Sequence, residues 1–273
     1  MNFFEKFLYF LQGKMNTPVA FGWFHLLWLG LIIVSIFILY KLKHRFNERQ
    51  LKFVLFIYGM VALIFEILKQ LIWAFNFDSV TSTVNWDYEW YSFPFQLCTT
   101  PMIVSIICFF LKSGKVRKSL LSYMSFVTII GGIMTIFMPD SCFTSDILIN
   151  IHTMWLHFGG FVVSIYLLMS GAVEIKLKNL RNAFFVFLIF VGIAEILNIV
   201  VYNIGVLNGE TFNMFYISPY FISNLPVFDV IQQNVPYVIY VLIYILAVTL
   251  GSFIIYLISL FISKLTNRKV IKK

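Results

Sequence analysis

The chain has 273 residues, of which 60% are hydrophobic and 12% are charged, and its mean hydropathy is +0.90. These values lie far outside the range of soluble domains, so they exclude a soluble fold and predict a membrane protein. The net charge of +8 does not indicate a nucleic-acid partner, because the basic residues occur in short clusters between apolar segments.

Residues 1–20 have the pattern of a short amphipathic segment, with polar residues between apolar ones. A helix of this kind lies in the membrane interface with its apolar face toward the acyl chains. The sequence therefore predicts that this segment rests on the outer leaflet. The apolar residues at helical spacing are Phe3, Phe4, Phe7, Leu8 and Leu11.

Residues 21–263 form the predicted membrane domain. A helix rises about 1.5 Å per residue, so about 20 apolar residues cross a hydrocarbon core of roughly 30 Å. Seven segments meet this requirement, which predicts an all-α bundle of seven transmembrane helices. The segments are 21–40, 51–75, 93–111, 119–138, 151–170, 183–205 and 235–263.

The connections between these segments predict the orientation. The first, third and fifth connections and the tail 264–273 are basic, whereas the second, fourth and sixth contain acids and no Lys or Arg. Cytoplasmic loops retain Lys and Arg, so the amino terminus is expected outside and the tail in the cytoplasm of a multi-pass cell-membrane protein. The basic residues include Lys41, Lys43, Arg45, Lys112, Arg117, Lys176, Arg181, Arg268, Lys272 and Lys273; the acids include Asp78, Glu89, Asp140, Asp146 and Glu210.

Several ionisable or polar residues fall inside the predicted spans. Such groups cost several kcal/mol in a membrane unless they are paired or hydrated, so each is a candidate for function. Glu66 and Lys69 stand at i,i+3, which lets them pair on one helix face. The other candidates are Gln96, Cys98, His152, His157, Glu195 and Asn198.

The orientation assigns a depth to these residues. Counted from the outer end of each span, Cys98 and His157 both lie roughly 8 to 10 Å below the outer surface. Polar groups from several segments share this layer, which predicts an outward-opening polar cavity. The others at about this depth or slightly deeper are Lys69, Glu66, Glu195 and Asn198.

The same residues have structural interpretations. Glu66 and Lys69 also suit an ion pair between helices, and Glu195 with Asn198 suits hydrogen bonds that hold helices together. His152 lies at the predicted interface, where a histidine is usually just solvated. The three cysteines predict neither a disulfide framework nor a metal site, and no cofactor is expected.

Cys98 stands in a distinctive local sequence. Ser92 and Pro94 predict a helix start, which places Cys98 about one turn into the helix, where the dipole favours a thiolate. Pro101 cannot donate a backbone hydrogen bond, so a kink with a free Leu97 carbonyl is expected. The alternatives are that Cys98 merely packs or forms a disulfide with Cys142; Cys108 is expected to be a core residue.

Two segments carry a family resemblance: residues 93–102, FPFQLCTTPM, and residues 152–160, HTMWLHFGG. With these in view, the chain resembles the YwaF-like family of bacterial membrane proteins, which is related to the eukaryotic transmembrane protein 164 acyltransferase. The resemblance covers about residues 20 to 262, and its most specific part is the Leu-Cys segment.

The resemblance implies a cysteine nucleophile and a histidine that move a fatty acyl chain between phospholipids. Cys98 matches the cysteine, and His157, followed by Gly159 and Gly160, resembles the histidine-glycine position. Thr99 and Thr100 are minor candidates, since a more distant group of lipid-ester hydrolases uses threonine in place of this cysteine.

The resulting hypothesis is a lipid acyltransferase or lipid-ester hydrolase. His157 takes the thiol proton, and Cys98 attacks the ester of a membrane phospholipid to form a thioester. The acyl chain then passes to a lysophospholipid or to water. The supporting candidates are Asn198, Gln96 and Lys69 for the oxyanion, Glu195 and Glu66 for orienting the base, and His152 as the second histidine.

Two other functions fit the same pattern. A transporter or lipid-binding protein would use an outward-facing polar cavity without covalent chemistry, but it would be expected to show matched broken helices in two halves, and these are not evident. A scaffold or sensor would leave Cys98 without an acyl adduct. The sequence predicts no oligomeric state.

Overall fold

The computed structural model describes residues 1–42, 47–139 and 142–271, and side chains as far as residue 265. Five residues used in the orientation argument, Lys43, Arg45, Asp140, Lys272 and Lys273, lie outside the described residues, and the side chain of Arg268 does as well.

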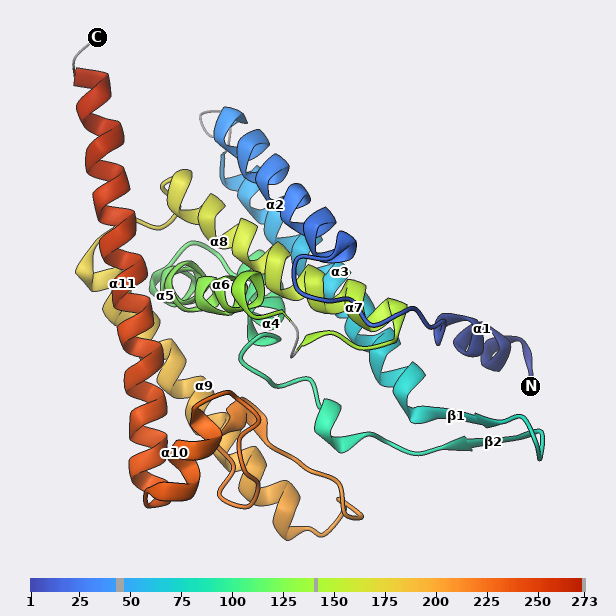
Figure 1. The fold of residues 1–273 in the computed structure, drawn as a ribbon. Helices are drawn as coiled ribbons and strands as arrows, with labels where there is room; N and C mark the ends of the chain where they lie inside the picture. Colours follow the sequence, from blue (N-terminus) through green and yellow to red (C-terminus); the bar gives the residue numbers. More distant parts are fainter. Residues whose placement is uncertain (43–46, 140–141, 272–273) are drawn as a thin grey trace.

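Within the described residues, six helical segments are long and apolar enough to cross a membrane. In Figure 1, α9 and α11 stand on one side of the bundle and α2 and α3 on the other, with the remaining segments between them. The six segments are α2 (Trp23–Leu42), α3 (Glu48–Ala74), α5 to α6 (Lys115–Phe137), α7 to α8 (Ile147–Met169), α9 (Leu177–Asn203) and α11 (Tyr237–Ile271).

Two of these segments are each interrupted by a π-helical turn. Met124–Thr128 lies between α5 (Lys115–Tyr123) and α6 (Ile129–Phe137), and Trp155–Gly159 lies between α7 (Ile147–Met154) and α8 (Gly160–Met169). A π-turn leaves part of the helical hydrogen-bond ladder displaced and is frequent at functional sites. The second turn contains His157.

Only part of the predicted third span is helical. The helix α4 (Thr100–Phe110) has 11 residues, so it is about 16 Å long and too short for a core of roughly 30 Å. A multi-pass helical membrane protein is therefore confirmed in outline, while the seventh crossing and the orientation stay predictions. Hydropathy did not show that the helix begins only at Thr100, because hydropathy measures composition and not backbone geometry.

The predicted kink at Pro101 is wrong. Pro101 lies in the first turn of α4, where no backbone donor is needed, so it starts the helix instead of bending it. The Leu97 carbonyl is not free, because it accepts a hydrogen bond of 2.9 Å from Thr100 Oγ1. The preceding turn is closed by Thr99, whose amide donates to the Gln96 carbonyl over 3.0 Å.

The amino-terminal segment forms the expected helix, α1 (Phe3–Leu11), which begins with a capping box between Asn2 and Glu5. Leu8 packs on Ile72 and Phe75, while Phe3 and Phe10 remain exposed. Figure 1 shows α1 and the hairpin of β1 (Phe75–Asp78) and β2 (Thr83–Trp86) extending to the same side. The position of α1 in the membrane interface stays a prediction.

The long connection between α9 and α11 is folded into the core. It contains the short 3-10 turn Met214–Tyr216 and the helix α10 (Phe228–Asn234). Phe212, Met214 and Phe215 are fully buried, as expected for an ordered cover and not for a linker. Hydrogen bonds tie this cover to Trp90, Gln96 and Asn198.

Candidate functional site

The predicted pair of Glu66 and Lys69 forms on α3. Lys69 Nζ lies 2.7 Å from Glu66 Oε1, and the two residues are only 8% and 2% exposed. His152, which is also buried, approaches the other carboxylate oxygen from α7, with its Nε2 3.2 Å from Glu66 Oε2. The fold therefore joins two predicted ionisable groups of α3 to one of the two predicted histidines.

The turn Trp90–Ser92 completes this cluster. The Ser92 carbonyl accepts hydrogen bonds from Lys69 Nζ at 3.1 Å and from Gln70 Nε2 at 2.7 Å. Gln70 Nε2 also lies 2.8 Å from Glu66 Oε1. Because water is scarce in such a site, these protein contacts must replace the hydration that the charges lose on burial.

The residues before Ser92 form a second layer over the cluster. The Trp90 amide donates to Glu210 Oε2 over 2.7 Å, which ties this connection to the long cover. Burial raises the pKa of Tyr88, and the carboxylates of Glu66 and Glu210 raise it further. The field of the buried cluster thus reaches the connection that covers it.

Cys98 lies in the turn that precedes α4, not one turn inside a helix as predicted. It is half-buried, and it is a free thiol and not a disulfide partner of Cys142. The sulfur is within electrostatic range of Lys69 and Glu66. Glu66 is paired with Lys69 and offsets its positive charge, so the ammonium does not replace the predicted helix dipole as a source of thiolate stabilisation.

His157 lies in the π-helical turn Trp155–Gly159, with its Nδ1 3.3 Å from the carbonyl oxygen of Gly131. If Nδ1 carries the proton, this carbonyl accepts it and Nε2 keeps a lone pair that can act as a base. His152 and His157 are within electrostatic range of each other. Among the hydrogen bonds of the described residues, none joins Cys98 to either histidine.

Gln96 and Asn198 both hold the cover. Gln96 donates to the Asn213 carbonyl at 2.9 Å and accepts from the Phe215 amide at 2.8 Å. Asn198 donates to the Met214 carbonyl at 3.1 Å and accepts from its amide at 2.7 Å. These side chains fix a backbone that has a positive φ of 58° at Phe215, a conformation that bulky residues rarely adopt.

The remaining candidates lie outside the cluster around Glu66. Glu195 is half-buried on α9 and interacts with the hydroxyl of Tyr237 on α11. The hydroxyl of Thr99 donates to the Gln96 carbonyl at 2.9 Å. Thr100 Oγ1 lies 2.6 Å from the Tyr123 hydroxyl. Both threonine hydroxyls therefore have local structural partners.

Sequence reasoning missed Tyr58. This residue is buried on α3, and its hydroxyl donates to the Leu156 carbonyl over 3.1 Å. It is also within electrostatic range of Cys98. Tyr58 precedes Lys69 by about three helical turns and so lies on nearly the same face of α3. The separation of Tyr58 and Lys69 along the sequence could therefore have indicated that Tyr58 lies on the same helix face as the cluster.

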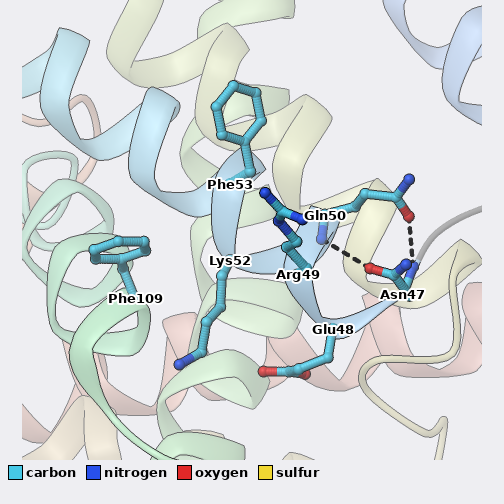
Figure 2. Close-up of a pocket in the computed structure, with 7 residues that line it drawn as sticks. All are labelled: Asn47, Glu48, Arg49, Gln50, Lys52, Phe53 and Phe109. Atoms are coloured by element: carbon cyan, nitrogen blue, oxygen red, sulfur yellow. Dashed lines mark hydrogen bonds between the residues drawn. The ribbon is translucent and has the colours of Figure 1, made fainter.

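The other end of α3 has a hollow of about 850 Å³, shown in Figure 2. Its lining runs from Asn47 to Phe53 and includes Phe109, so it lies roughly 20 Å along α3 from Glu66. We do not assign it to the candidate site. In the part of the chain that the structure describes, His, Cys, Asp and Glu form no group of three that could hold a metal ion.

Comparison with known families gives one match: the model of the TMEM164 family matches residues 20–257. No curated protein and no solved structure matches the chain. The family match confirms the resemblance to the eukaryotic transmembrane protein 164 family, whereas the bacterial YwaF-like label stays a prediction.

Proposed function

Because the chain belongs to the TMEM164 family over residues 20–257, we propose that it is a membrane enzyme that transfers or hydrolyses the acyl chain of a membrane lipid. The observation that carries this proposal is the buried cluster of Glu66, Lys69 and His152, which is bonded to the Ser92 carbonyl in the segment that leads to the free thiol of Cys98. An apolar bundle tolerates buried charges at a cost of several kcal/mol, so such a cluster favours a functional role.

Cys98 is the proposed nucleophile. A histidine removes the thiol proton, and the sulfur attacks the ester carbonyl of a phospholipid. The carbon–sulfur bond forms and the ester carbon–oxygen bond breaks, and the histidinium returns its proton to the departing lysolipid oxygen. A hydroxyl of another lysolipid, or water, then attacks the thioester and regenerates the thiol. Lys69 is the proposed positive charge for the oxyanion that forms when the sulfur attacks the ester.

His157 is the proposed base, and His152 is the alternative. The Gly131 carbonyl orients His157 through Nδ1, which leaves Nε2 for the thiol proton. Glu66 Oε2 lies 3.2 Å from Nε2 of His152 but does not form a well-directed hydrogen bond with it, and Nδ1 of His152 is the nitrogen left for the thiol proton. In each histidine, the group that contacts one ring nitrogen determines whether the other nitrogen carries a proton or keeps its lone pair. Contacts with the thiol are expected to tighten when a substrate binds.

The proposed site serves the outer leaflet. This assignment depends on the alternating basic and acidic connections, from which the carboxyl end of α3 and the amino end of α7 are predicted to lie outside. A phospholipid ester lies near the headgroup boundary, at about the depth of the polar cluster. The proposed substrates are therefore phospholipids and lysophospholipids of the cell membrane.

Acyl transfer by the purified protein tests this function. The protein is placed in phospholipid bilayers with a phospholipid that carries a labelled acyl chain and an unlabelled lysophospholipid. Cys98→Ala is expected to lower transfer at least about 100-fold, because the thioester cannot form. Cys108→Ala is the matched control, since this buried thiol lies in α4 and has no proposed role.

A second arm of the experiment compares the histidines. Mass spectrometry should find an acyl adduct on Cys98 of the native protein, and His157→Asn should suppress it more than His152→Asn. The reverse order would assign the base to His152. Undiminished transfer by Cys98→Ala would contradict the covalent mechanism and favour a lipid-binding protein or transporter.

A further inference from the structure

An apolar groove of about 280 Å³ lies between α2, α3 and the helix that contains the π-turn Trp155–Gly159. On α2 it is lined by Trp28, Ile32 and Ser35. On α3 its lining includes Ile57, which is partly exposed on the outside of the bundle. Since these helices are membrane spans by length and composition, the groove opens toward the hydrocarbon core of the bilayer.

The groove starts close to the candidate site. Tyr58 and Gly159 line it, and the Tyr58 hydroxyl bonds to the carbonyl of Leu156, the residue before His157. Leu156 also packs in one core cluster with Met102, which is four residues after Cys98. Along α3, Tyr58 lies about 12 Å from Glu66. The apolar groove therefore begins about two turns from the charged cluster.

From that start the groove runs along the helices, away from the cluster. On α3 it extends from Tyr58 back to Phe53, and on α8 it extends forward to Val163. Because α3 and α8 run in opposite directions along the chain, both of these ends lie farther from Glu66 than Tyr58 does. The polar cluster is thus followed by an apolar groove, and an acyl ester has the same order, with a polar ester group followed by an apolar chain.

Gly159 keeps this part of the groove open. A Cβ atom at Gly159 would lie 3.1 Å from Tyr58 Cε2, closer than most real contacts. A side chain there would displace the Tyr58 ring or fill the groove. The absence of a side chain lets the π-turn and the Tyr58 ring approach each other while space remains beside them.

We propose that this groove binds the acyl chain of the lipid substrate while the ester reaches Cys98, an inference that rests on the proposed function. Apolar cavities disfavour water, and the molecules that surround a groove in the hydrocarbon core are acyl chains. The volume of about 280 Å³ lies just below that of typical drug-sized pockets. The groove therefore accepts one chain and not a whole phospholipid.

Ser35 and Ile57 are lining residues at which a larger side chain is expected to reduce the space for a bound chain. Ser35→Phe would fill the groove from α2, and each methylene that it displaces should lower affinity about fourfold. Val34→Phe is the matched control, because Val34 is the adjacent residue, is 54% exposed and is absent from the groove lining. Ile57→Trp fills the groove from α3 and serves as the second variant if Ser35→Phe does not fold.

The test uses the full chain carrying Cys98→Ala in bilayers that contain a phospholipid with a diazirine on one acyl chain. Light should crosslink this chain to groove residues of α2, α3 and α8, and Ser35→Phe or Ile57→Trp should lower that crosslinking at least about fourfold. Val34→Phe should leave it unchanged. Crosslinking spread evenly over the exposed faces of α2, or crosslinks between two copies through the groove, would overturn the proposal.

Catalysis is measured separately in protein that retains Cys98. If the groove binds the substrate chain, Ser35→Phe should lower transfer of long chains at least about fourfold relative to short ones, whereas Val34→Phe should not. An unchanged chain preference would overturn the substrate role of the groove. Absence of any transfer by the native protein would instead contradict the proposed function, while the crosslinking result decides chain binding independently.

Discussion

Buried charged side chains lie at both ends of α3, but the partners that replace their lost hydration differ between the two ends. At the amino end, Arg117 is 4% exposed and pairs with Glu48, whose side chain is 58% exposed. Arg117 Nε also donates to the Cys108 carbonyl at 2.9 Å. At the carboxyl end, Glu66 and Lys69 are both buried and share their contacts with His152.

This difference shows where the protein accepts a large desolvation cost. Water can solvate the exposed carboxylate of Glu48, so only one member of that pair depends on the protein. At the other end every charge depends on protein partners, and a buried ion pair is seldom retained for stability alone. The buried cluster also bonds to the Ser92 carbonyl, in the segment that leads to the free thiol of Cys98.

The largest expected effect comes from breaking the buried cluster. Glu66→Ala would leave Lys69 and His152 buried without their carboxylate, so we expect the free energy of unfolding to fall by about 3–5 kcal/mol. Denaturant unfolding in mild detergent micelles measures this change. Lipid acyl transfer should fall as well, because Cys98 loses part of its ordered surroundings.

The matched control for this change is Glu174→Ala. Glu174 also pairs with a lysine, Lys176, but both side chains are more than 60% exposed. We expect no measurable shift of its unfolding transition, because exposed pairs contribute little. Equal stability losses in the two variants would show that burial does not distinguish the cluster.

A smaller effect is expected from loosening the cover over this end of the bundle. Asn198→Ala removes both hydrogen bonds to the buried backbone of Met214, so we expect a loss of about 2–3 kcal/mol. Hydrogen exchange of residues 213–216 should accelerate. Ile196→Ala, a change at a residue of the same helix that is 63% exposed, should leave exchange there unchanged; slow exchange in both variants would show that Asn198 does not hold the cover.

The smallest effect is expected at the amino end of α3. Glu48→Ala removes the exposed partner of the buried Arg117, which keeps its bond to the Cys108 carbonyl, so we expect a loss of about 1–2 kcal/mol. The same unfolding measurement applies, and acyl transfer should be unaffected. A loss as large as that of Glu66→Ala would make the two ends equivalent and remove the basis for distinguishing the cluster.

The sequence by itself determined the membrane class and most of the helices. Length and hydropathy located six spans, because a helix must bury its backbone in lipid over a fixed thickness. The i,i+3 spacing also sufficed for the pair of Glu66 and Lys69, since neighbours on one helix are set by local geometry. The same local reasoning found the amphipathic helix α1.

The tertiary structure decided how the polar residues are grouped. Residues 93–99 form turns instead of the first part of a span, because Gln96 binds the cover and Thr99 closes a local turn. The contact of His152 with Glu66 joins helices distant in the chain, as does the clamp of Asn198 on Met214. Such contacts depend on which helix faces meet, and composition and spacing along one helix do not carry that information.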